Sequence, residues 1–173
     1  MEDVYRPAED SYLLAKHVEL LVAGSVLDMG TGSGIQAVSA AMKPSVESVM
    51  AVDINPAALE EAKKRAEREG VSGKLTFVIS DLFHEVNGRF DWIIFNSPYL
   101  PSEGEADERA WAGGAQLIER FLTEARDHLE PGGSILLIYS SLSEPDMRGY
   151  KVKLLEEIGQ FFEKLFCVRL SPT

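Results

Sequence analysis

Apolar and polar positions along the chain fall into blocks that predict helices and strands in turn. Apolar side chains at helical spacing predict helices over 9–22 and 117–129. Short apolar runs bounded by glycine, proline or polar residues predict buried strands. The predicted strands span 25–29, 46–52, 75–79, 90–95, 134–139 and 164–170, and further helices are predicted over 35–42, 56–69 and 150–162. This alternation indicates a doubly wound, Rossmann-like α/β sheet with parallel core strands and helices on both faces.

Two segments outside the predicted sheet are expected to serve a site. We expect a single domain over 1–173, with a helical segment at 1–23 that covers the ligand site. The longest irregular stretch, 97–114, follows a predicted strand and is rich in proline, glycine and glutamate. Because long loops at the carboxyl ends of such strands are usually functional, we expect 97–114 to contact the substrate.

Composition narrows the partners and the compartment. The net charge is −11, and the 17 Lys and Arg residues are scattered, so a protein partner is favoured and nucleic acid is disfavoured. There is no apolar run of the roughly 18 residues that a membrane span needs, and the acidic N-terminus lacks the features of a signal peptide. Cys167 is the single cysteine and cannot form an internal disulfide. We therefore expect a cytoplasmic protein that does not contact membranes.

Polar or glycine-rich residues follow four of the predicted strands where each one ends. The first strand runs into the sequence Asp-Met-Gly-Thr-Gly-Ser-Gly at 28–34, and the next three end at Asp53, at Asp81-Leu82 and at Asn96. Ligands of open α/β sheets bind outside the carboxyl ends of the strands, so these residues are expected to meet at one site. From 28–34 the candidate contacts are Asp28, Gly30, Thr31, Gly32 and Gly34.

The glycine spacing alone leaves two cofactors open. Asp53 lies about twenty residues beyond the glycine turn, where it could accept hydrogen bonds from ribose hydroxyls, and a relaxed dinucleotide fingerprint fits NAD as well. Asp28 favours S-adenosylmethionine, because an acid would repel a pyrophosphate but could pair with the amino group of a methionine moiety. Asp81 could accept from the adenine amino group. The plainer alternatives are a turn-capping carboxylate at Asp28 and a helix N-cap at Asp81.

The segment Asn96-Ser97-Pro98-Tyr99 is suited to methylating a planar nitrogen. Such a nitrogen is a poor nucleophile and needs orientation toward the methyl group more than it needs a strong base. The side-chain oxygen of Asn96 can accept one N–H of the acceptor, and the backbone carbonyl of residue 97 can accept the other. Tyr99 can pack on the planar face. The alternative is a strand end followed by a proline-containing turn. The three histidines show no metal-ligand spacing, and no metal site is expected.

These motifs together resemble the HemK-type class I methyltransferases, over nearly the whole chain. The resemblance rests on 26–34, on Asp-Ile-Asn-Pro at 53–56 and on the segment at 96–99, where the family's usual tetrapeptide is Asn-Pro-Pro-Tyr. Val-Tyr-Arg-Pro-Ala-Glu-Asp-Ser at 4–11 and Ala-Trp-Ala-Gly-Gly at 110–114 are similar to the archaeal and eukaryotic branch.

The resemblance implies N5-methylation of the glutamine in the Gly-Gly-Gln loop of a class I translation termination (release) factor, with S-adenosylmethionine as cofactor. It also implies a small zinc-ribbon activator protein that pairs with the sheet edge, and some members act on lysine. The implied cofactor contacts are Ser11, Asp28, Gly30, Asp53, Asp81, Leu82 and Asn96, and the implied catalytic positions are Asn96, Pro98 and Tyr99.

Three departures from the family pattern keep other functions open. Ser97 replaces the first proline of the tetrapeptide, Arg6 replaces a glutamate, and the chain stops at Thr173, where a further strand is expected. The sheet is therefore expected to lack its last antiparallel strand or to have its edge completed by something else. The alternatives are an adenine or guanine N-methyltransferase acting on RNA or DNA, and a weakly active cofactor-binding partner subunit.

Overall fold

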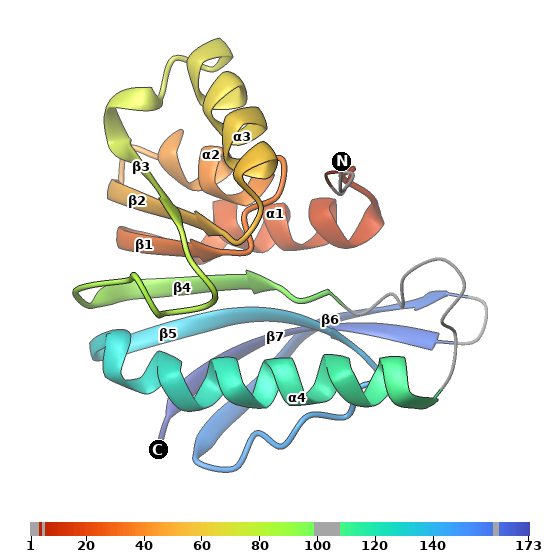
Figure 1. Ribbon diagram of the computed structural model, residues 1–173. Helices are drawn as coiled ribbons and strands as arrows, with labels where there is room; N and C mark the ends of the chain where they lie inside the picture. The colour runs from red at the N-terminus through yellow and green to blue at the C-terminus, as the bar shows by residue number, and fades with distance from the viewer. Residues whose placement is uncertain (1–3, 5, 99–107, 161–162) are drawn as a thin grey trace.

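A computed structural model describes residue 4 and residues 6–98, 108–160 and 163–173 of the chain (Figure 1). Most of the predicted elements are present with similar bounds. In chain order they are α1 (Glu9–Leu21), β1 (Gly24–Met29), α2 (Ile35–Ala41), β2 (Val46–Asp53), α3 (Pro56–Arg68), β3 (Leu75–Ile79), β4 (Phe90–Asn96), α4 (Glu108–Ala125), β5 (Leu129–Ser140), β6 (Tyr150–Gln160) and β7 (Glu163–Pro172). Single 3₁₀ turns, Ser72–Lys74 and Arg126–His128, precede β3 and β5.

The strands form one seven-stranded sheet in the order β3-β2-β1-β4-β5-β7-β6. The first five strands in this order are parallel, and β7 runs antiparallel to both β5 and β6. The chain winds outward from β1 to β3 and then returns to place β4 on the other side of β1. The carboxyl ends of β1 and β4 are therefore neighbours at the point where the winding direction reverses, which is where open sheets bind ligands.

Helices cover both faces of the sheet, as predicted (Figure 1). On one face α1 and α2 pack through small and branched apolar side chains, such as Leu14 and Ala40, against Ile94 and Leu136 of the sheet. On the other face α4 buries an apolar stripe that includes Phe121. The doubly wound α/β class is thus confirmed, with the apolar core divided into two layers by the sheet.

The prediction of a helix over 150–162 is wrong, because this segment begins with strand β6. A β-bulge lies between Leu154 and Glu156, and the extra residue shifts the in-and-out alternation by one position. Leu154, Leu155 and Ile158 consequently follow a spacing that imitates a helix. With β6 in place the sheet has seven strands, so the expectation of a missing last strand is also wrong.

The boundaries around α4 also differ from the prediction. The helix begins at Glu108, so 108–114 belong to α4 and only the first part of the predicted loop over 97–114 can be irregular. At its other end α4 stops at Ala125, and Leu129 already pairs with Phe90 as the first residue of β5. The Pro-Gly-Gly sequence at 131–133 lies inside β5, where the pairing with β4 shifts register.

Candidate active site

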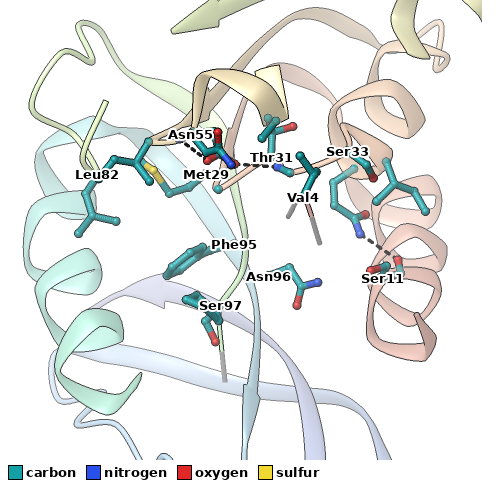
Figure 2. Close-up of a pocket in the computed structure, with 18 of the residues that line it drawn as sticks. Val4, Ser11, Met29, Thr31, Ser33, Asn55, Leu82, Phe95, Asn96 and Ser97 are labelled. Atoms are coloured by element: carbon teal, nitrogen blue, oxygen red, sulfur yellow. Dashed lines mark hydrogen bonds between the residues drawn. The ribbon is translucent and has the colours of Figure 1, made fainter. Parts of the chain in front are cut away.

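A cavity of about 480 Å³ opens at the carboxyl edge of the sheet, where β1 and β4 diverge. Its walls come from the ends of four parallel strands, from the loop between β1 and α2, and from the first turn of α1 (Figure 2). The predicted cofactor-binding residues that line it are Ser11, Gly30, Thr31, Gly32, Asp53, Asp81, Leu82 and Asn96. In Figure 2, Leu82 and Ser11 stand toward opposite ends of the cavity, with Asn96 between them.

Asp28 does not line the cavity, in contrast to the predicted cofactor contact. Its Oδ2 accepts hydrogen bonds from the Thr31 hydroxyl at 2.6 Å and from the Ala37 backbone N–H at 3.0 Å. Burial raises the pKa of the Asp28 carboxyl to about 7, against these two hydrogen bonds, which favour the ionised form. Asp28 therefore braces the turn between β1 and α2, as in the turn-capping alternative, and stabilises this part of the cavity wall.

Gly34 also lies outside the cavity, and its place in the fold explains why glycine is needed there. It is the N-cap of α2 with a φ of 79°, in the left-handed region. A Cβ at this position would lie 2.7 Å from the Cβ of Ala62 in α3. The residue thus permits the close approach of α3 to the loop and is a packing glycine rather than a ligand contact.

Asp53 joins the ends of β1 and β2 at the cavity wall. Its Oδ2 accepts from the Gly32 backbone N–H at 2.8 Å, and its Oδ1 accepts from the Asn55 N–H at 2.9 Å. These bonds hold the carboxylate in one orientation. Each carboxylate oxygen has a second lone pair, so Asp53 can still accept from the hydroxyls of a bound ribose.

Asp81 and Leu82 form the wall at the end of β3. The residues after Asp81 form a turn, so Asp81 is not a helix N-cap; its carboxylate oxygens lie 3.2 and 3.1 Å from an Nη of Arg120 in α4. Leu82 has a φ of 47°, in the left-handed region that a branched side chain seldom adopts. The Ser80 hydroxyl donates to the Leu82 carbonyl at 2.8 Å and stabilises this conformation. Such strain at a cavity wall is typical of binding sites.

The catalytic candidates lie where β4 leaves the sheet. The Asn96 Nδ2 donates to Oδ2 of Asp10 in α1 at 2.7 Å, and the Asn96 Oδ1 is buried without a hydrogen-bond partner. Ser97 and Pro98 also line the cavity, and Tyr99 lies outside the described residues. The hydroxyl of Ser97 donates to the Ile138 carbonyl of β5 at 2.7 Å, which ties this residue to the sheet in place of the proline ring of the family pattern.

The cavity residues that the sequence analysis missed include two buried polar side chains, Asp10 and Gln36. Asp10 is 1% exposed and fixes Asn96, while Gln36 is 2% exposed and donates from Nε2 to the Ser11 carbonyl at 2.8 Å. The Oε1 of Gln36 is a second buried acceptor without a partner. One signal was available for Gln36, because it is the single long polar side chain in the small, apolar segment that forms α2.

The cavity is acidic, which favours S-adenosylmethionine over a dinucleotide, the two cofactors left open by the glycine spacing. Among the described residues that line it are three aspartates, at 10, 53 and 81, and no lysine or arginine. The charged side chains at the wall would repel a pyrophosphate, whereas they would attract a sulfonium and an ammonium group. In the described part of the chain, no group of three or more His, Cys, Asp or Glu side chains is placed to hold a metal ion.

The strand order and the acidic site at its switch point together define a class I methyltransferase. Residues 7–163 match the family of the Methyltransferase small domain, so the chain belongs to that family. Within it the chain is a methyltransferase of the HemK type, as its relatives show. None of the described helices is long and apolar enough to cross a membrane.

Three relatives carry names that bear on the acceptor. A Methanocaldococcus jannaschii protein with the provisional name protein N5-glutamine methyltransferase is 35% identical, over 96% of this chain and 90% of its own length. Methyltransferase HEMK2 of Mus musculus is 34% identical, over 83% of this chain and 75% of its own length. The release factor glutamine methyltransferase of Rhodopirellula baltica is 34% identical, over 80% of this chain and 51% of its own length.

A solved structure shares the fold. TrmK of M. capricolum, in complex with S-adenosylhomocysteine, superposes with a TM-score of 0.67 over 97% of this chain and 70% of its own, at 14% identity. At this identity the likeness concerns the fold alone.

Proposed function

We propose that this protein uses S-adenosylmethionine to methylate the side-chain nitrogen of the glutamine in the Gly-Gly-Gln loop of a class I translation termination factor. The observation that carries the proposal is the amide of Asn96. Its nitrogen is held by Asp10 at 2.7 Å, so its oxygen is left at the cavity wall as a buried acceptor of fixed orientation and without a partner. The names of the relatives support a glutamine acceptor.

The described residues fit the cofactor in the order in which the strands lie. The carboxyl ends of β3, β2, β1 and β4 follow one another along the sheet edge. Asp81 and Leu82 would hold the adenine, Asp53 would accept from the ribose hydroxyls, and the loop from Gly30 to Gly32 would pass beneath the amino-acid end. When bound, S-adenosylmethionine supplies an electrophilic methyl group. This order leaves the reacting end of the cofactor beside β4.

Asn96 orients the acceptor rather than activating it as a base. Its Oδ1 would accept one N–H of the glutamine amide, and the backbone carbonyl of Ser97 would accept the other. Both bonds turn the amide nitrogen toward the methyl group for attack in line with the bond that breaks. As the nitrogen gains the methyl group its proton becomes acidic and is lost to water, so the site needs no strong base. Packing of Tyr99 on the planar amide stays a prediction.

The protein substrate, and a small zinc-ribbon activator at the sheet edge, are part of this proposal. The test is transfer of a tritiated methyl group from S-adenosylmethionine to a recombinant termination factor, with and without the activator. The matched control is a factor in which the glutamine of the Gly-Gly-Gln loop is alanine. We expect labelling of the natural factor and none of the control.

Other outcomes would redirect or overturn the proposal. Labelling that persists on the alanine factor would place the target elsewhere in that protein. Labelling of RNA or DNA in place of the factor would show the nucleobase alternative. If the protein binds S-adenosylhomocysteine but labels nothing in the presence of the activator, a partner-subunit role would replace the enzymatic one. The Asn96→Ala variant, which retains cofactor contacts elsewhere, should bind the cofactor but transfer the methyl group at only a small residual rate.

A further inference from the structure

The cavity contains a second buried acceptor that the proposed methyl transfer does not use, the Oε1 of Gln36. Gln36 lies in the first turn of α2, lines the cavity and is 2% exposed. A buried polar atom without a hydrogen-bond partner costs about 1–3 kcal/mol, so such atoms at a cavity wall indicate a ligand that supplies the missing group. Here the missing group is a donor.

The orientation of the Gln36 amide is fixed by α1. Its Nε2 donates to the backbone carbonyl of Ser11 at 2.8 Å. The reverse orientation would place Oε1 against that carbonyl, so that two acceptors would face one another and the hydrogen bond would be lost. The oxygen of Gln36 is therefore the amide atom that is left without a partner at the cavity wall. Ser11 is itself held in place, because its hydroxyl accepts from the Ala8 N–H and caps the start of α1.

The position of Gln36 selects the part of the ligand that it would meet. The adenine and ribose positions of the proposed site lie at the ends of β3 and β2. Gln36 lies beyond them, on α2 where its side chain contacts α1. This is the end of the cavity that would receive the amino-acid end of the methyl donor, which carries an ammonium and a carboxylate. An amide oxygen without a partner matches the ammonium and would repel the carboxylate.

We infer that Gln36 is a cofactor-binding residue whose Oε1 accepts a hydrogen bond from the α-ammonium group of S-adenosylmethionine. The inference rests on the methyl donor named in the proposed function, and not on the identity of the acceptor. The negative charge of Asp10, which lines the same cavity, adds to the attraction for a cation. The neutral amide of Gln36 would orient the ammonium group through a hydrogen bond, while the negative aspartates would attract its positive charge.

The test compares two ligands on two proteins by calorimetry. The ligands are S-adenosylhomocysteine and its deaminated analogue, which lacks only the ammonium group. The variant is Gln36→Met, which keeps the length of the side chain but has no acceptor oxygen. A hydrogen bond to a charged group contributes about 1.5–3 kcal/mol, so the variant should bind S-adenosylhomocysteine at least tenfold more weakly. Binding of the deaminated analogue should change less than about twofold.

Controls separate this role from a structural one. Gln116→Met changes an exposed glutamine of α4 outside the cavity and should leave both affinities unchanged. Gln36→Ala is a second variant with the same expected selectivity, and thermal unfolding shows whether each variant is folded. Equal weakening of both ligands, or no weakening of either, would overturn the role of Gln36. Failure of the unaltered protein to bind S-adenosylhomocysteine would instead refute the methyl donor of the proposed function, and this inference with it.

Discussion

Asp10 offers the sharpest test of how the site orients its acceptor. Its carboxylate is 1% exposed and accepts from the Asn96 Nδ2 at 2.7 Å, a bond that joins the first turn of α1 to the end of β4. In the Asp10→Ala variant the Asn96 amide loses the bond that holds it in its productive orientation. In the flipped orientation the Asn96 Nδ2 would face the N–H of the substrate glutamine. Both groups are hydrogen-bond donors, so the orienting bond could not form.

The expected loss follows from the strength of this bond. A hydrogen bond to a charged group contributes about 1.5–3 kcal/mol, and about 1.4 kcal/mol corresponds to a tenfold change in rate. Asp10→Ala should therefore lower kcat by about 10- to 100-fold. Asp10→Asn can still present an amide oxygen to Asn96, but as a neutral acceptor of about half the strength, so its kcat should fall by about 3- to 10-fold.

The assay is steady-state methyl transfer to the termination factor, measured in single variants and in combination with Asn96→Ala. If Asp10 acts through Asn96, adding Asp10→Ala to Asn96→Ala should cause no further loss of the residual rate. Glu19→Ala, an exposed change on the same helix, is the control for the loss of one negative charge from α1. The reasoning would be refuted by an unchanged kcat in Asp10→Ala, or by equal losses with and without the Asn96 side chain.

Three further predictions concern the surroundings of the cavity. The Ser97→Ala variant loses the hydrogen bond to the β5 carbonyl, and its kcat should fall by about 2- to 10-fold. The Ser97→Pro variant should retain most of the rate. A proline variant slower than the alanine variant would contradict this prediction. The pKa of the Asp28 carboxyl is about 7 in the folded protein and 3.8 ordinarily, so its contribution to stability is full below pH 4 and is lost as the pH rises to 7. The free energy of unfolding in urea should therefore depend less on pH over this window in the Asp28→Asn variant than in the unaltered protein. Gly34→Ala should lower the free energy of unfolding by about 2–4 kcal/mol, because it adds a clash with Ala62 to the cost of a positive φ. The control Gly70→Ala, at a φ of 70° in open space, should cost about 1–2 kcal/mol, and equal losses would show that space at Gly34 is not limiting.

The central parallel strands could be predicted because their carboxyl-terminal halves are largely buried. Runs such as 49–52 and 92–95 are apolar without interruption and lead into polar residues, so both their type and their direction toward the site follow from the sequence. Strand β6 could not be predicted in this way. It lies at the sheet edge, where Val152 and Leu154 are 50% and 52% exposed, and its bulge changes the face to which the following side chains point.

The sequence predicts the site only from the residues at the ends of individual strands. Asp28 and Met29 are neighbours at the end of β1, and alternation sends their side chains to opposite faces of the sheet. Met29 lines the cavity and Asp28 turns toward α2, but the sequence does not say which of the two faces inward. The hydrogen bond between Asp10 and Asn96 joins residues 86 positions apart, and a local sequence pattern cannot predict such a contact.

Helix α1 therefore influences what the cavity can bind, because it sets the orientation of the amides of both Asn96 and Gln36. Polar contacts also join it to the sheet edge, where Glu156 of β6 lies 2.8 Å from the Lys16 Nζ and 3.0 Å from the His17 Nε2. A partly exposed ion pair contributes about 0–1 kcal/mol, whereas burial of one large apolar side chain contributes about 1.5–3 kcal/mol. Leu14 and Val18 of α1 are both fully buried, so apolar packing fixes the register of the helix on the sheet. The orientation of Asn96 and Gln36 is thus a consequence of core packing. Packing places Asp10 and Ser11, and the hydrogen bonds that the two amides donate to them leave the amide oxygens as acceptors at the active site.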